Sequence, residues 1–138
     1  MIPQSYRDSN EFVGVHAFRV LLAAPPEAGD CMASSSWARV PVLVLAGRAE
    51  TESDAVKQFL KLRPDAIVLD WRLSVDEPAR LIGVLRRMVA DARVIAVVPD
   101  QASMPALAAR AMGADVIVTL PDLSRTLVSM ARAATRRR

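Results

Sequence analysis

Residues 62–73 have the sequence LRPDAIVLDWRL, and this stretch decides the fold class. Its centre, 66–69, is short, rich in branched side chains and apolar at every position. A strand that is apolar on both faces is typical of a parallel sheet covered by helices on both sides. The run ends on an acidic residue, Asp70, which the predicted strand therefore places at its carboxyl end.

The chain carries four more short, mostly apolar runs, at 18–23, 40–46, 94–98 and 116–120. Segments with apolar residues at helical spacing lie between them, at 51–62, 77–90 and 103–112, and another follows Asp122. Strands that alternate with helices predict right-handed crossovers with helices on both faces of the sheet. We therefore expect an α/β fold with a doubly wound, five-stranded parallel sheet of the flavodoxin type, in the order 2-1-3-4-5.

Several residues are suited to begin or end the predicted helices. Thr51 to Asp54 has the spacing of a capping box, Asp76 and Asp122 can each cap a helix, and Gly113 can stop one. The segment 26–37 is less defined, because a glycine and three consecutive serines disfavour a helix. It is predicted as a short or distorted helix or as a loop.

Composition predicts one domain. The 138 residues are 52% apolar, which is enough for a single core, and we expect that domain at 17–135, between a flexible leader at 1–16 and a basic tail at 136–138. The formal net charge is +3, and the arginine tail is interpreted as a solvated end of the chain. No apolar run approaches the roughly 20 residues that cross a bilayer. A single cysteine, Cys31, excludes an internal disulfide, so a cytoplasmic location is expected.

Functional residues are expected at the carboxyl ends of the strands, where sheets of this kind place their sites. The residues that end or follow the predicted strands there are Ala24, Asp70, Val98 and Leu120.

The residues quoted above resemble the receiver domains of two-component response regulators. A second matching piece is Ala-Met-Gly-Ala-Asp at 111–115, followed by Leu120-Pro121, and the resemblance extends over roughly 18–134. It implies that Asp70 is the phospho-acceptor position. It also implies an acidic pair after the first strand that binds magnesium, a Ser or Thr at the end of the fourth strand, and a Lys at the end of the fifth.

The chain departs from this pattern at the positions that assist phosphorylation. The acidic pair falls on Ala24 and Pro25, the hydroxyl on Val98 and the lysine on Leu120. The aromatic switch position falls on Ile117 and the expected proline on Ser74. We therefore expect an atypical, or pseudo-, receiver with no metal or other cofactor and no enzymatic activity. In this interpretation Asp70 is vestigial and hydrogen-bonds loop amides.

The leading hypothesis is a signalling or regulatory module that acts by protein–protein contact, independently of phosphorylation. Its expected surface is formed by the fourth helix, fifth strand and fifth helix, where it binds a protein partner or a second copy. The candidate contacts are Met104, Arg110, Arg125 and Met130. No membrane contact is expected, and DNA binding would need an additional domain.

Two alternatives remain at this point. The chain is a phospho-accepting receiver if Glu27 or Asp76 supplies a carboxylate to Mg²⁺. It is a small-molecule sensor or enzyme if it binds a ligand, although it has no phosphate-binding glycine motif and no metal-ligand cluster. Among the remaining residues, Trp37 is expected in the core, Trp71 near the pocket and Cys31 partly buried, and His16 is assigned no role.

Overall fold

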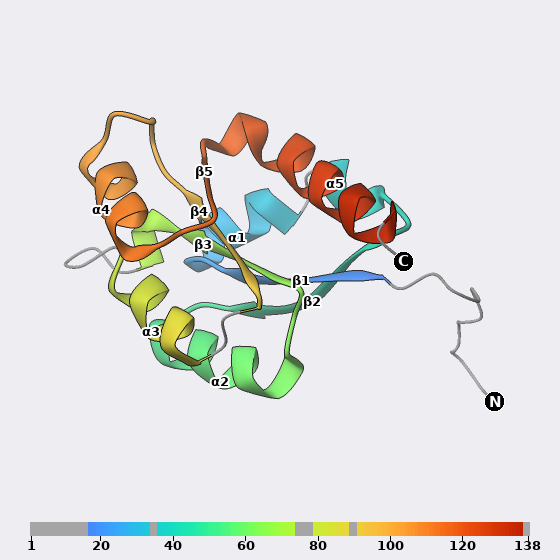
Figure 1. Ribbon diagram of the computed structural model, residues 1–138, viewed down its shortest axis with the longest axis horizontal. Coiled ribbons are helices and arrows are strands. Elements are labelled where there is room, and N and C mark those ends of the chain that lie inside the picture. The colour runs from blue at the N-terminus through green and yellow to red at the C-terminus, as the bar shows by residue number, and fades with distance from the viewer. Residues whose placement is uncertain (1–16, 34–35, 74–78, 89–90, 137–138) are drawn as a thin grey trace.

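The computed structural model describes residues 17–33, 36–73, 79–88 and 91–136. Their centre is a five-stranded parallel sheet in the order β2-β1-β3-β4-β5 (Figure 1). The strands are β1 (Phe18–Ala23), β2 (Leu43–Ala49), β3 (Ala66–Asp70), β4 (Arg93–Val97) and β5 (Val116–Val118). This architecture confirms the predicted flavodoxin-like sheet with order 2-1-3-4-5.

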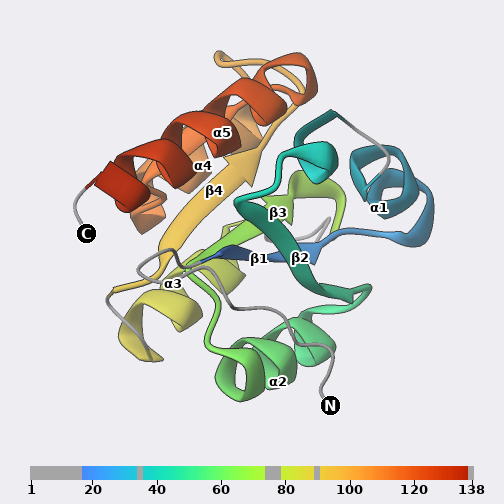
Figure 2. The same ribbon diagram turned by 90° about the vertical axis from the view of Figure 1, so that its right-hand side faces the viewer.

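Helices cover both faces of the sheet. They are α1 (Pro26–Ala33), α2 (Glu52–Leu62), α3 (Arg80–Met88), α4 (Met104–Met112) and α5 (Leu120–Arg136), with 3-10 turns η1 (Ser36–Arg39) and η2 (Trp71–Leu73). Helices α1 and α5 lie on one face, and α2, α3 and α4 lie on the other (Figures 1 and 2). No helix in the described part of the chain is long and apolar enough to span a membrane.

The core has two layers because successive strand residues point to opposite faces. In β1, Val20 and Leu22 join the α1/α5 layer, whereas Leu21 and Ala23 join the layer under α2, α3 and α4. All five residues of β3 are buried. The strands are apolar on both faces because helices bury both faces of the sheet. Trp37 is fully buried in the α1/α5 layer, as predicted, and its Nε1–H donates to the Met32 carbonyl.

The predicted helix ends are confirmed where local chemistry decides them. The Thr51 hydroxyl accepts the Asp54 amide at 3.1 Å and caps α2. At α4 the structure adds a cap that was not predicted, since the Ser103 hydroxyl accepts the Ala106 amide at 3.2 Å and the helix begins at Met104. Gly113 ends α4 with a φ of 96°, a left-handed conformation that favours glycine.

Predicted boundaries of the second strand, the fifth strand and the last helix are wrong. The second strand begins at Leu43 instead of Val40, because Val40 to Leu43 forms a turn in which the Leu43 amide donates to the Val40 carbonyl. The last helix begins at Leu120 instead of after Asp122, so β5 ends at Val118 and Asp122 lies in the first turn of α5.

Smaller differences concern the fourth strand, the segment 26–37 and the third helix. The fourth strand is Arg93–Val97, one residue earlier than predicted. The segment 26–37 forms α1 and, from Ser36, the 3-10 turn η1, and Cys31 on α1 is exposed where partial burial was expected. The third helix is described from Arg80, so the predicted cap Asp76 lies outside the described residues, as do the leader 1–16 with His16, and Ser74.

Candidate functional site at the carboxyl ends of the strands

The sheet brings three of the predicted site positions to one edge. Asp70 ends β3 and pairs with Val97 of β4, so Val98, the next residue, lies beside the end of β3. Ala24 follows β1, which lies on the other side of β3. Ala24, Asp70 and Val98 are all buried. Leu120, at the start of α5, is exposed, and Pro25, which follows Ala24, is partly buried.

Asp70 is engaged by a single neighbour in the sequence, Arg72. One carboxylate oxygen, Oδ1, accepts the Arg72 backbone amide at 2.8 Å and its Nε–H at 2.9 Å. The other oxygen, Oδ2, accepts from Nη2 at 2.8 Å. This is the two-pronged geometry in which a guanidinium matches a carboxylate best. The turn η2 makes it possible because it carries the chain back over the strand end within two residues.

The pair is buried on one side and open on the other. The Asp70 side chain is 0% exposed, whereas that of Arg72 is 46% exposed. Arg72 thus covers the carboxylate and presents its own outer edge to solvent. Its Cζ also lies 5.8 Å from the centre of the Trp71 ring, within the range of a cation–π contact.

The pKa of Arg72 is raised, first because the guanidinium hydrogen-bonds Asp70. Burial acts in the opposite direction, and the negative charge of Asp70 raises the pKa further. Smaller contributions come from Cys31 and Glu27, which both belong to α1. Arg72 is therefore a permanent cation, and Glu27 is near enough to act on it electrostatically.

The site has little space and little metal-binding chemistry. A cavity beside Asp70, lined otherwise by apolar side chains such as Ile82, Val98 and Pro105, has a volume of about 10 Å³. That is at the lower limit for one water molecule. Within the described ranges, no three His, Cys, Asp or Glu side chains are grouped to hold a metal ion. Mg²⁺ takes carboxylate oxygens, and the one carboxylate buried here is already held by Arg72, so the described residues do not fit this ion.

The comparisons with known structures agree with this topology. The response regulator domain of Thermotoga maritima CheB aligns with a TM-score of 0.71 at 19% identity, over 88% of this chain and 98% of that one. A LuxR-family response regulator from Aurantimonas aligns with a TM-score of 0.72 at 23% identity, over 88% of this chain and 87% of that one. The chain has the receiver-domain fold. No protein-family model and no curated protein sequence matches it.

Another solved structure with this fold contains Mg²⁺ and BeF₃⁻, which the described residues at Asp70 are not suited to bind. It is the complex of CheX and CheY from Borrelia burgdorferi with BeF₃⁻ and Mg²⁺, which aligns with a TM-score of 0.69 at 13% identity, over 83% of this chain and 90% of that one. At such identities the likeness establishes the fold alone. The chemistry at Asp70 must be argued from this chain's own residues.

The predicted interface residues of the receiver fold lie on α4 and α5, the helices that flank β5 in the sequence. Met104 is 75% exposed at the start of α4. Arg110 is exposed and donates to the Gln101 carbonyl and side chain, and Arg125 pairs with Asp122. Met130 is partly buried and packs against the α1/α5 core layer.

Arg72 is not among the predicted site residues. The side chain is part of the quoted motif, but an arginine after a strand is ordinarily a solvated residue. The sign that could have revealed it is its position two residues after an apolar strand that ends on an aspartate.

Proposed function

We propose that this chain is an atypical receiver, a signalling or regulatory module that acts by protein–protein contact without phosphorylation of Asp70. The observation that carries the proposal is the Asp70–Arg72 pair. Both carboxylate oxygens accept hydrogen bonds from Arg72, and the side chain has no exposed surface. An oxygen that attacks a phosphoryl donor must first leave this partner.

The surroundings of Asp70 also oppose an acyl phosphate. Such a group adds roughly two negative charges, and its transfer is catalysed almost entirely by positioning and charge neutralisation. Ala24, Pro25, Val98 and Leu120 supply no carboxylate, hydroxyl or ammonium group. The loss of one stabilising donor typically costs about 3 kcal/mol of transition-state energy, so several losses slow the reaction by orders of magnitude.

The direct test uses acetyl phosphate and Mg²⁺ on the full chain. Intact-mass spectrometry is expected to show no added phosphoryl group in the wild type or in Asp70→Asn. Phosphorylation of the wild type that disappears in Asp70→Asn would refute the proposal. A second readout is the binding of BeF₃⁻ with Mg²⁺, followed through the fluorescence of Trp71, which is expected to stay unchanged.

A second candidate function is that of a phospho-accepting receiver with unusual ligands. The observation in its favour is that Glu27, in the first turn of α1, makes a small contribution to raising the pKa of Arg72. In that case Mg²⁺-dependent phosphorylation occurs on Asp70 and is abolished by Glu27→Gln. The same mass measurement, with Asp30→Asn on the exposed side of α1 as the matched control, separates the two candidates.

The proposed contact surface is the α4-β5-α5 face, by which we mean the exposed side of residues 103–134. Its apolar part includes Met104 and Leu107, which are 75% and 52% exposed, and its charged part includes Arg110 and Arg125. Exposed apolar residues beside arginines are common at protein interfaces. A protein partner or a second copy is the proposed occupant, catalysis is no part of the role, and the proposed location is the cytoplasm.

A further inference from the structure

A hollow lies at the amino ends of β3 and β4, the edge of the sheet opposite Asp70. It has a volume of about 510 Å³ and is formed by the ends of α2 and α3 and by the segments that lead into the two strands. Volumes of this size are typical of small-molecule sites. We call it the amino-edge hollow. Six of its lining residues carry side chains suited to contact a ligand, namely Phe59, Leu60, Arg63, Asp65, Met88 and Asp91.

One part of the amino-edge hollow is apolar. Phe59 is buried in the core layer under α2, α3 and α4, so its ring is a fixed wall. Met88 is partly buried, and Leu60 is 51% exposed. A leucine in this position gains free energy when an apolar group of a ligand removes it from water. This part of the hollow therefore suits an aliphatic or aromatic group.

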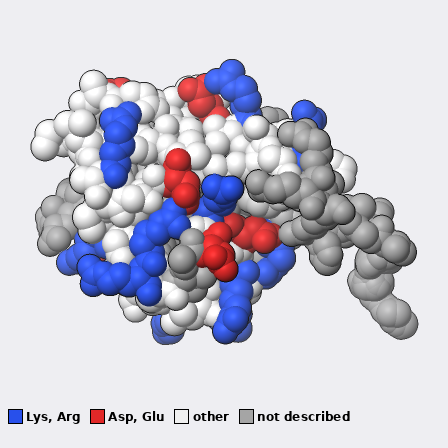
Figure 3. Space-filling view, in the orientation of Figure 1, with Lys and Arg blue, Asp and Glu red and all other residues white. Residues whose placement is uncertain are grey.

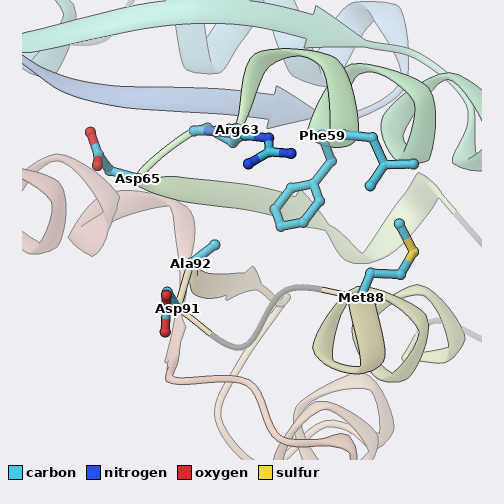
Figure 4. Close-up of a pocket in the computed structure, with 8 residues that line it drawn as sticks. Phe59, Arg63, Asp65, Met88, Asp91 and Ala92 are labelled. Carbon is cyan, nitrogen blue, oxygen red and sulfur yellow. The ribbon is translucent and has the colours of Figure 1, made fainter.

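The other part of the hollow carries two carboxylates and one guanidinium. Figure 4 shows Asp65 and Asp91 at one end, Phe59 and Met88 at the other, and Arg63 between them. Acidic and basic side chains also lie next to one another over the amino ends of β3 and β4 in the space-filling view (Figure 3). Two negative charges and one positive charge leave an excess of one negative charge in the lining. The hollow therefore favours a ligand with an ammonium group over a simple anion.

These charged groups are largely unused within the described part of the chain. There, neither Arg63 nor Asp91 forms an ion pair, and the two do not pair with each other. Asp65 Oδ2 accepts the Arg19 backbone amide at 2.8 Å, and Oδ1 has no partner among the described residues. A carboxylate and a guanidinium that share a hollow without meeting leave room for a molecule that bridges them with opposite charges.

We propose that the amino-edge hollow binds an apolar α-amino acid as a zwitterion, either free or in a short peptide. The ammonium group pairs with Asp91 and with the available oxygen of Asp65. The carboxylate pairs with Arg63, whose guanidinium can match it with two parallel hydrogen bonds. The apolar side chain of the ligand packs on Leu60 and Phe59.

Ligands with a single charge suit the hollow less well. A carboxylic acid meets two carboxylates, and an amine leaves the Arg63 guanidinium beside a second positive charge. The site goes beyond the contact function proposed above, because the hollow shares no lining residue with the cavity at Asp70 or with the α4-β5-α5 face.

The test is an NMR titration of the ¹⁵N-labelled full chain with small probes. L-Leucine and the dipeptide Leu-Leu carry both charges and an apolar side chain, whereas isopentylamine lacks the carboxylate, 4-methylpentanoate lacks the ammonium group and glycine lacks the side chain. Leucine or the dipeptide is expected to bind with a Kd below about 1 mM and to shift the amide signals of Arg63 and Asp91. The three incomplete probes are expected to bind at least about tenfold more weakly. The tighter of the two complete probes identifies the source of the ligand.

Variants of the chain locate the binding. Leu60→Gln and Asp91→Asn are each expected to weaken the binding of the complete probes about tenfold. Leu107→Gln on α4, where the exposed fraction is 52% against 51% for Leu60, is the control for the apolar contact. Glu50→Gln removes an exposed carboxylate outside the hollow and is the control for the charge. Neither control is expected to change the affinity.

Arg63→Gly separates binding from folding. Arg63 ends α2 with a φ of 47°, a left-handed conformation that glycine adopts without strain. The variant is therefore expected to keep or raise the melting temperature while it weakens the binding of the complete probes about tenfold. Its affinity for isopentylamine is expected not to fall, because that probe has no carboxylate for the guanidinium to bind.

Several outcomes would overturn the proposal. One is that neither leucine nor the dipeptide binds at concentrations up to about 10 mM. Others are that glycine, the amine or the acid binds as tightly as the complete probes, or that Asp91→Asn or Arg63→Gly leaves the affinity unchanged. Equal losses of affinity in the two control variants would also count against this hollow as the site.

Discussion

At the scale of single residues, the chemistry of Asp70 is set by a side chain two positions away. A buried carboxylate is unfavourable unless it is paired and hydrogen-bonded, and Arg72 satisfies both oxygens. Arg72 thus supplies a positive charge beside Asp70, where Ala24 and Pro25 offer no carboxylate for Mg²⁺ and Leu120 offers no ammonium group. The aspartate at the strand end is thus retained although its side chain is closed off from solvent.

Replacement of Arg72 by Ala is expected to lower the free energy of unfolding by about 1–2 kcal/mol. Removing one partner of a buried pair is costly, but Arg72 is partly exposed and water compensates some of the loss. Urea unfolding measures the change. In the background of Asp70→Asn the same substitution is expected to cost markedly less, and equal costs in the two backgrounds would show that the pair does not hold the turn.

The sequence predicted those site residues whose position depends only on where a strand ends. Asp70 and Val98 fall at the edge where strand patterning placed them. The role of Arg72 was not predictable in this way, because it depends on a 3-10 turn that aims the guanidinium back at the strand end. The exposure of Cys31 was missed for a similar reason, since it depends on which face of a short α1 packs on the sheet.

At the scale of elements, helix caps decide where α2 and α4 begin. The Thr51 hydroxyl satisfies an amide that has no partner inside α2. Thr51→Ala is therefore expected to destabilise the protein by about 1 kcal/mol. Ser53→Ala, an exposed position within the first turn of the same helix, is the control and is expected to stay within about 0.5 kcal/mol of the wild type. Thermal unfolding of both variants is the measurement, and equal melting temperatures would count against the cap.

A second element-scale contact joins α3 to the loops before β4 and β5. The Arg86 guanidinium donates to the Ala92 and Gly113 carbonyls, each at 3.0 Å, and pairs with Asp115. Arg86→Met is expected to cost about 2 kcal/mol, because it leaves these acceptors unsatisfied. Its neighbour Arg87 is exposed, and Arg87→Met is expected to be nearly neutral. Chemical denaturation of the two variants side by side tests this, and similar midpoints would contradict it.

The boundaries that the sequence did not predict lie where tertiary contacts override local pattern. The apolar run from Val40 predicted a strand, but the strand pairs with β1 only from Leu43 onward, and the turn before it contains Pro41. The later part of β2 contains Gly47 and Arg48, which have no strand-like pattern. These residues pair with β1 because β2 lies beside it at an edge of the sheet. Asp122 resembled a cap, but Pro121 is tolerated in a first turn and α5 starts before it.

At the scale of the whole molecule, the fold was predictable because it depends on average properties of each segment. Buried parallel strands are apolar on both faces, and each helix has one apolar face, so the order of elements can be read without exact boundaries. Partner surfaces differ in this respect. A stripe of apolar residues predicts a buried helix face, and only the fold distinguishes the exposed Leu107 and Leu60 from the buried Leu81 and Leu85.

The α4-β5-α5 face leads to a prediction about assembly. Met104 and Leu107 are 75% and 52% exposed on α4, and self-association would bury them. The chain is expected to form a dimer in sedimentation equilibrium, and Met104→Asp with Leu107→Asp is expected to weaken that dimer at least about tenfold, since a buried unpaired charge costs more than 1.4 kcal/mol. Leu60→Asp on α2, where Leu60 is 51% exposed outside this face, is the matched control and is expected to leave the dimer intact. A wild type that stays monomeric, or a dimer that Leu60→Asp disrupts equally, would contradict assembly through this face.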